Sequence, residues 1–105
     1  MPRLWVDVDG TLIDAEDRPN YALILAVNKV VNGTDTELVI WSGGGAEYAN
    51  TWGRRLFPWT SWKSVAKDQR LPQPEDLVID DVLEFTPVHP VRVILPVDFI
   101  EAMLP

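Results

Sequence analysis

Short apolar runs alternate with polar and glycine-containing segments along the chain. Isolated apolar runs of about four to eight residues predict buried strands, whereas longer segments with a continuous apolar side predict helices. The predicted strands cover residues 4–8, 38–41, 59–65, 77–79 and 91–95. The predicted helices cover residues 21–31 and 46–57, and a short helix follows the last strand. This alternation predicts an α/β fold whose five strands form a mainly parallel sheet, flanked by helices and buried on both faces.

Residues at the predicted helix ends support this assignment. Asn20 directly precedes the first helix, where an asparagine side chain can cap the free backbone N–H groups. Gly33 follows the same helix, so we expect it to adopt a left-handed cap conformation. Asp98 and Glu101 have the spacing of a capping box, which predicts that the C-terminal helix begins after Asp98.

Composition and charge narrow the classes of function. The 105 residues predict one domain, covering positions 1–105, and no apolar run is long enough to cross a membrane. The formal net charge of -7 argues against a broad nucleic-acid-binding face, which needs clustered lysine and arginine. The chain has no cysteine, so thiolate metal sites and disulfides are excluded, and we expect a cytoplasmic protein.

The segment Asp7-Val8-Asp9-Gly10-Thr11 ends the first predicted strand. Side chains two residues apart in an extended segment point to the same side, so Asp7 and Asp9 can face one site. One carboxylate can attack a substrate while the other transfers protons, and both suit a hard cation such as Mg²⁺. The alternative is an ordinary strand followed by an Asp-Gly turn. A calcium-binding EF-hand loop is excluded, because Leu12 and Arg18 occupy the positions that require glycine and glutamate.

Polar residues also follow the ends of other predicted strands, at the edge where parallel α/β sheets bind ligands. Asp80 and Asp81 follow residues 77–79, and together with Asp7 and Asp9 they would repel one another without a cation. Ser42 precedes three glycines and a predicted helix, so this loop could hold phosphate oxygens or could be a flexible connection. Lys63 or Lys67 could neutralise charge near the carboxylates, and the other would be an ordinary solvated lysine.

The order of these motifs resembles that of the haloacid dehalogenase (HAD) superfamily. The matching residues are Asp7-Val8-Asp9-Gly10-Thr11, Ser42, a lysine and Asp80-Asp81, and they span most of the chain. The resemblance implies that Asp7 is the nucleophile and becomes an aspartyl phosphate. It implies that Asp9 is the general acid and base, with its main-chain carbonyl oxygen on Mg²⁺. The second aspartate is typical of phosphatases and phosphomutases, whereas true dehalogenases lack it.

The resemblance also assigns roles to the remaining site residues. Ser42, with Gly43 and Thr11, would bind the phosphoryl group of the substrate. Asp81 corresponds to the usual metal-binding acid, supported by Asp80. Lys67 is expected to be the catalytic lysine, rather than Lys63, because it follows the third predicted strand and starts the loop toward Asp80.

The family likeness implies a Rossmann-like core with the first strand at the centre. Many family members carry a cap domain, but the intervals from Asp9 to Ser42 and from Ser42 to Lys67 leave no room for one. We therefore expect a capless, magnesium-dependent phosphomonoester hydrolase with an open site, whose phosphorylated substrate the sequence does not identify. A homo-oligomer in which a neighbour covers the site is possible. A phosphotransferase or phosphomutase, a phospho-accepting signalling domain, and a non-catalytic phosphate-binding module remain as alternatives.

Two other features predict no chemistry of their own. His89 lies between prolines, and the chain has no second histidine that could complete a transition-metal site. Trp52, Trp59 and Trp62 could form a stacking surface for a base or sugar, although tryptophans with this spacing more often belong to the core or its rim.

Overall fold

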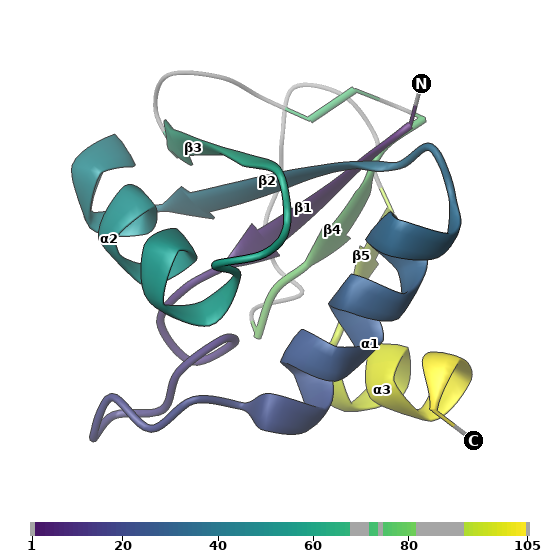
Figure 1. The fold of residues 1–105 in the computed structure, drawn as a ribbon. Helices are drawn as coiled ribbons and strands as arrows, with labels where there is room; N and C mark the ends of the chain where they lie inside the picture. Colours follow the sequence, from purple (N-terminus) through teal and green to yellow (C-terminus); the bar gives the residue numbers. More distant parts are fainter. Residues whose placement is uncertain (1, 68–71, 74, 82–91, 105) are drawn as a thin grey trace.

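The computed structural model describes residues 2–67, 72–73, 75–81 and 92–104, and these residues form alternating strands and helices (Figure 1). The strands are β1 (Arg3–Asp7), β2 (Glu37–Ser42), β3 (Trp62–Ala66), β4 (Leu77–Ile79) and β5 (Arg92–Ile94). The helices are α1 (Tyr21–Gly33), α2 (Ala46–Leu56) and α3 (Pro96–Met103). The predicted succession of elements is confirmed, with shifts at several boundaries.

The five strands form one sheet in the order β3-β2-β1-β4-β5, and every neighbouring pair is parallel. The strand β1 lies at the centre, with β2 on one side and β4 on the other. The chain therefore builds outward from β1 through β2 to β3, and then returns to the other side of β1 with β4. Ligands of such Rossmann-like sheets bind at this switch point, beyond the carboxyl ends of the strands.

Both faces of the sheet are buried, as predicted. One face carries Leu4, Val6, Leu38 and Ile40, and all three described helices contribute side chains to this core. Alternate residues point to the other face, where Trp5 and Trp41 pack edge to face with ring centroids 5.1 Å apart. Val39, Val65 and Val78 complete the second cluster. Asp7 continues the alternation of the Trp5 face, so its carboxylate lies at the end of this second cluster.

The helix ends differ in part from the predictions. Asn20 caps α1 as expected, because its side-chain oxygen accepts a hydrogen bond from the Leu23 N–H at 3.2 Å. The predicted left-handed cap at Gly33 is wrong: Gly33 belongs to the last turn of α1, and the extended Thr34 ends the helix while its hydroxyl donates to the Val30 carbonyl oxygen. The predicted capping box is also wrong, because α3 begins at Pro96, whose fixed backbone angle suits a first helical position.

The strand β3 begins at Trp62 rather than at Trp59. The Thr60 N–H donates to the Phe57 carbonyl oxygen at 3.3 Å, and this turn after α2 leaves Trp59 95% exposed. Trp52 is buried against the main core, and Trp62 is half-buried with its indole N–H on the Phe57 carbonyl oxygen. Two of the three tryptophans are thus core or rim, and Trp59 is a surface residue.

The structure describes every residue from 10 to 66, and this range contains no cap domain. After β1, residues 12–20 form a flap, which α1 follows; after β2, the chain forms only α2 and β3 before Lys67. Asp14 fixes the flap, since its carboxylate accepts hydrogen bonds from the Glu16 and Arg18 N–H groups, each at 2.9 Å. The hydrogen bond from the Arg18 backbone, followed by that from Glu16 and the charge of Arg18, lowers the pKa of Asp14.

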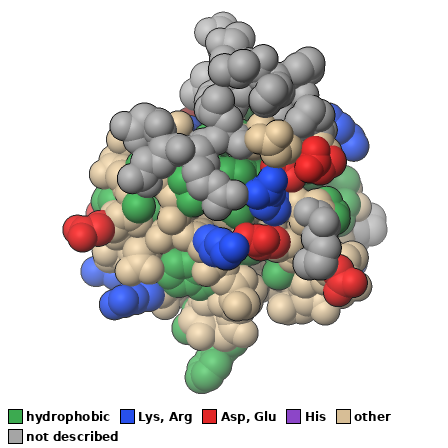
Figure 2. Space-filling model, turned by 90° about the horizontal axis from the view of Figure 1, so that it is seen from above, with side chains coloured by type: hydrophobic (Ala, Val, Ile, Leu, Met, Phe, Trp, Pro, Cys, Tyr) green, Lys and Arg blue, Asp and Glu red, His purple; other side chains and the backbone are tan. Residues whose placement is uncertain are grey.

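The distribution of charged side chains on the surface relates to the expectation that the chain has no broad nucleic-acid-binding face. On the face that Figure 2 shows, basic and acidic side chains of the described residues are interspersed rather than gathered into a basic patch. None of the described helices has the length and apolar character needed to cross a membrane. His89 and residues 82–91 lie outside the described residues, so the interpretation of His89 stays a prediction.

Candidate active site

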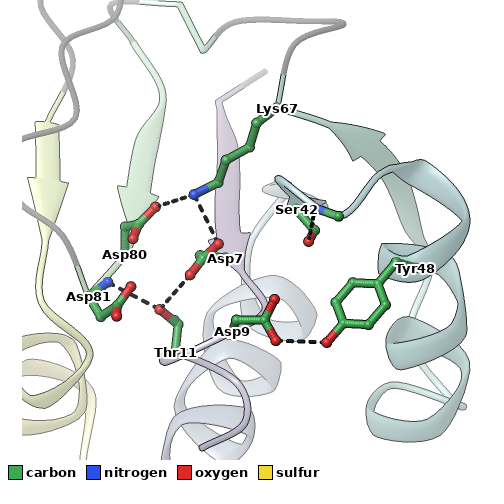
Figure 3. A network of polar contacts seen from close by, with 9 residues as sticks. Asp7, Asp9, Thr11, Ser42, Tyr48, Lys67, Asp80 and Asp81 are labelled. Carbon is green, nitrogen blue, oxygen red and sulfur yellow. Dashed lines mark hydrogen bonds and ion pairs between the residues drawn. The ribbon is translucent and has the colours of Figure 1, made fainter. Parts of the chain in front are cut away.

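Three carboxylates meet at the switch point of the sheet (Figure 3). Asp7 is the last residue of β1, and Asp80 and Asp81 directly follow β4, which pairs with β1. One oxygen from each carboxylate lies within 4.8 Å of the others. The predicted cluster is therefore formed by three of the four acids, while the Asp9 carboxylate lies outside it. The strand ends at Asp7 instead of Val8, so the side-chain alternation used in the prediction does not extend to Asp9.

Lys67 connects two of these carboxylates. It directly follows β3, and its Nζ atom lies 3.0 Å from Asp7 Oδ1 and 2.9 Å from Asp80 Oδ2. The same ammonium lies 5.2 Å from the ring centroid of Trp41, which pairs with Asp7 in the register of β1 and β2. Lys63 points elsewhere, into an exposed ion pair with Glu37 at 3.1 Å. Of the two candidate lysines, Lys67 is the one at the cluster.

Burial and like charge perturb the carboxylates. Burial, followed by the charge of Asp80, raises the pKa of Asp7 from 3.8 to about 6, against the opposing effects of Lys67 and Thr11. Burial, with a hydrogen bond involving Asp80, also raises the pKa of Asp81. Burial alone would lower the pKa of Lys67, but its contacts with Asp80 and Asp7 outweigh this effect and raise it. Lys67 therefore stays charged, while ionisation of Asp7 is opposed by its surroundings.

Thr11 links the two sides of the cluster. Its buried hydroxyl donates to Asp7 Oδ2 at 3.2 Å and accepts from the Asp81 N–H at 3.1 Å. The adjacent Gly10 has a φ of 77°, and a side chain there would collide with the Asp81 carboxylate. The hydroxyl predicted to bind phosphate is thus engaged with protein groups, and the geometry indicates that Thr11 orients Asp7.

The Ser42 loop lies at the same edge of the sheet (Figure 3). Ser42 Oγ accepts a hydrogen bond from the Gly44 N–H at 3.0 Å, which leaves its hydroxyl proton available to donate. The Ser42 carbonyl oxygen accepts from the Lys67 N–H at 3.1 Å, so the loop and the lysine are fixed together. A side chain at Gly43 would meet open space, and Gly45, with a φ of 109°, directly precedes α2. The loop therefore presents an accessible backbone and one hydroxyl next to the start of a helix.

Asp9 contacts a residue that the sequence analysis did not select. Tyr48, in the first turn of α2, donates a hydrogen bond from its hydroxyl to Asp9 Oδ1 at 2.7 Å. This hydrogen bond, with a smaller effect of burial, raises the pKa of the Tyr48 hydroxyl. Tyr48 therefore remains a neutral donor toward an otherwise exposed carboxylate.

The donor set fits a hard divalent cation. Three carboxylates and one ammonium leave an excess of negative charge when all four groups are ionised. Carboxylate oxygens are the ligands that Mg²⁺ prefers, and Mg²⁺ keeps part of its water shell instead of requiring a complete protein cage. Asp7, Asp80 and Asp81 could thus hold a metal ion, with the exposed Asp81 on the solvent side.

Two contacts of the site were missed from the sequence. Trp41 could have been found, because side-chain alternation along β2 puts it on the Asp7 face of the sheet. Tyr48 had no such signal, since its reach to Asp9 depends on how α2 packs beside the flap. Comparisons of the chain with protein-family models, curated proteins and solved structures give no match.

Proposed function

We propose that this chain is a magnesium-dependent phosphomonoester hydrolase of the HAD type, acting through an aspartyl phosphate on Asp7. The observation that carries the proposal is the buried Asp7 carboxylate at the end of the central strand, held by Thr11 and Lys67 beside two further carboxylates. A carboxylate whose ionisation is opposed by its surroundings, at the switch point of a parallel sheet, is a candidate nucleophile with a physical rationale.

In the proposed first step, an oxygen of Asp7 attacks the phosphorus atom, and the bond from phosphorus to the leaving oxygen breaks. Thr11 and Lys67 fix the orientation of the carboxylate, which reduces the entropy lost on reaching the transition state. Lys67 would also offset the charge of the equatorial phosphoryl oxygens. The Ser42 hydroxyl and the Gly43 backbone would donate hydrogen bonds to the same oxygens.

Asp9 would transfer the protons of both steps. In the first step, its carboxyl proton goes to the leaving oxygen. In the second step, Asp9 takes a proton from the attacking water, the new bond from water oxygen to phosphorus forms, and the bond to Asp7 breaks. The products are an alcohol and inorganic phosphate, and Asp7 and Asp9 return to their initial states. Asp9 suits this role because its carboxylate is exposed beside the buried Asp7.

Asp7 and Asp81 would hold Mg²⁺ together with the main-chain carbonyl oxygen of Asp9. Bound Mg²⁺ would supply positive charge that offsets the phosphoryl group and the clustered acids. Asp80 Oδ2 accepts a hydrogen bond from Lys67 Nζ at 2.9 Å, so Asp80 would orient the lysine and support Asp81.

Hydrolysis is favoured over transfer to a second hydroxyl. No cap domain occurs within residues 10–66, and a side chain at Gly43 would meet open space, which supports access of water to the phosphoryl group. Enzymes that transfer a phosphoryl group between substrates must exclude water during the reaction. The phosphotransferase alternative would need a covering element from elsewhere.

Hydrolysis of an aryl phosphate, measured with and without Mg²⁺, tests the proposal. We expect the wild-type protein to release phosphate only with Mg²⁺, and Asp7→Asn to reduce the rate by several orders of magnitude because the covalent route is lost. Asp35→Asn is the matched control, since Asp35 is an exposed acid away from the cluster. Rapid acid quench during turnover should trap a phosphorylated wild-type chain and no phosphorylated Asp7→Asn chain, which would identify the intermediate. Full activity in Asp7→Asn or after chelation would contradict the mechanism.

A further inference from the structure

Asp7 and Asp9 are held very differently. Asp7 is anchored by Thr11 and Lys67 within a buried cluster. Asp9 lies in an exposed turn, and among the described residues Tyr48 is the hydrogen-bond donor to its carboxylate. Without this contact, the Asp9 side chain would be free to rotate into solvent.

The contact joins two segments that are separate in the chain. Asp9 follows β1, whereas Tyr48 lies in the first turn of α2, directly after the Ser42 to Gly45 loop. Gly44 lets the tyrosine ring lie against this loop, because a Cβ atom on Gly44 would be only 3.1 Å from Tyr48 Cδ2. Figure 3 shows the hydroxyl of Tyr48 directed toward Asp9 from the α2 side, across from Lys67 and Asp80.

Tyr48 occupies only one of the two carboxylate oxygens of Asp9. Tyr48 contacts Oδ1, and no hydrogen bond from another described residue reaches the second carboxylate oxygen, which would carry the proton and face the substrate oxygen that receives it. A tyrosine with a rigid ring fixes the carboxylate more narrowly than water would, because its position is set by α2.

We propose that Tyr48 is a positioning residue that holds Asp9 for proton transfer to the leaving group and from water. This inference rests on the proposed phosphohydrolase function. Tyr48 does not itself transfer a proton in either step: it donates the same hydrogen bond to Asp9 throughout. Tyr48 acts on Asp9 and not on Asp7, and the binding of the phosphoryl group does not depend on Tyr48.

Tyr48→Phe removes one hydroxyl and keeps the ring, so it is the direct test. We expect kcat to fall about tenfold, as is typical for the loss of a hydrogen bond to a charged group, with KM unchanged. The loss should be larger for an alkyl phosphate than for an aryl phosphate, because a poor leaving group depends more on protonation. Tyr21→Phe is the matched control: it changes the other tyrosine of the chain, which is 73% exposed at the start of α1.

A double variant separates positioning from a general structural effect. In Asp9→Asn, the further change Tyr48→Phe should cost no additional activity, because Tyr48 acts through Asp9. If Tyr48→Phe reduced activity by the same factor in wild type and in Asp9→Asn, the inference would be overturned. Full activity of Tyr48→Phe with alkyl esters would also overturn it, and neither result would affect the phosphohydrolase function.

A measurement without turnover distinguishes failure of the inference from failure of the function. The ¹³C carboxyl resonance of Asp9, assigned by its loss in Asp9→Asn, should shift in Tyr48→Phe and not in Tyr21→Phe. An unchanged resonance would mean that the contact is absent in solution, which overturns the inference. A shifted resonance in a protein that hydrolyses no phosphate ester would mean that the proposed function has failed, and the catalytic role of Tyr48 with it.

Discussion

The sheet has buried carboxylates at both of its ends, and Asp76 at one end differs from Asp7 at the other in the groups that surround it. At the amino end, Asp76 is 1% exposed and accepts hydrogen bonds from the Arg3 N–H, the Trp5 indole N–H and the Gln73 N–H. At the carboxyl end, Asp7 is 5% exposed and is held by Thr11 and Lys67 beside Asp80 and Asp81. Donors satisfy Asp76, whereas further acids surround Asp7.

This difference separates a structural carboxylate from a candidate catalytic one. Buried charges that serve stability are paired and hydrogen-bonded on their available sides, as Asp76 is. Burial and the charge of Asp80 oppose ionisation of Asp7, and such an arrangement is expected where a cation or a substrate completes the site. Substitutions at one end of the sheet at a time test this difference.

The largest effect is expected at Lys67, the cation of the carboxyl end. Lys67→Met should lower kcat/KM for an aryl phosphate by about 10²- to 10³-fold, because it removes positive charge from the position where phosphoryl charge develops. Lys63→Met is the matched control, since Lys63 is exposed and its ion pair with Glu37 lies on the surface. Steady-state kinetics, with circular dichroism to verify folding, give the measurement. A silent Lys67 change with an inactive Lys63 variant would reverse the assignment.

A comparably large effect, on stability instead of activity, is expected at Asp76. Asp76→Ala leaves the Trp5 indole, the Gln73 N–H and Arg3 without their acceptor, so the free energy of unfolding should fall by about 3 kcal/mol or more. Urea denaturation measures this change, and Asp35→Ala serves as the exposed control. The folded fraction should keep its kcat. A stable Asp76→Ala protein would mean that the amino-end network contributes little.

A smaller effect of opposite sign is expected when Asp7 loses its charge in metal-free protein. Its pKa is raised from 3.8 to about 6, so the folded chain binds this proton more tightly and loses stability as the pH rises from about 4 to about 6. At about pH 7.5 with chelator, Asp7→Asn should therefore be more stable than wild type by about 1 to 3 kcal/mol. At pH about 4 the difference should vanish. Thermal or urea unfolding across this pH range measures the difference in stability between Asp7→Asn and wild type. A difference that does not change with pH would contradict the expectation.

The smallest effect concerns Mg²⁺ itself. At a concentration about ten times its Kd, a ligand that binds only the folded state adds about 1.4 kcal/mol of stability, which raises Tm by several degrees in a chain of this size. We expect this shift in wild type and in the Asp35→Asn control, and a reduced shift in Asp81→Asn. Differential scanning fluorimetry with and without Mg²⁺ is sufficient. Equal shifts in wild type and Asp81→Asn would remove Asp81 from the metal site.

The sequence predicted the sheet, because continuous apolar runs and alternating elements determine strand number and parallel pairing. It also predicted the acids Asp7, Asp80 and Asp81 at one edge, since the carboxyl ends of parallel strands coincide. Element boundaries were less predictable: β3 begins only after the turn at Thr60, a tertiary detail with no periodic signal.

The contacts of individual side chains could not be predicted from spacing alone. The Thr11 hydroxyl joins Asp7 to Asp81, a contact that the sequence did not predict, and its expected role in binding phosphate stays a prediction. The preference for Lys67 over Lys63 rested on its expected position after β3, and the geometry agrees: Lys67 follows the carboxyl end of β3, next to Asp7 and Asp80, whereas Lys63 lies near the start of β3 and contacts Glu37. Tyr48 was missed, as its contact depends on the packing of a helix.

The pairing of β1 with β4 has a consequence for how the chain folds. Thr11 and Asp81 are in contact although 70 positions separate them, so the site forms only after a long loop has closed. Closing such loops costs entropy before any contact compensates for it, and proteins rich in distant parallel pairings fold slowly for this reason. The β1, α1 and β2 segment can assemble earlier from neighbouring parts of the chain. A refolding chain would thus bury much of its core before Asp7 first meets the acids that complete its site.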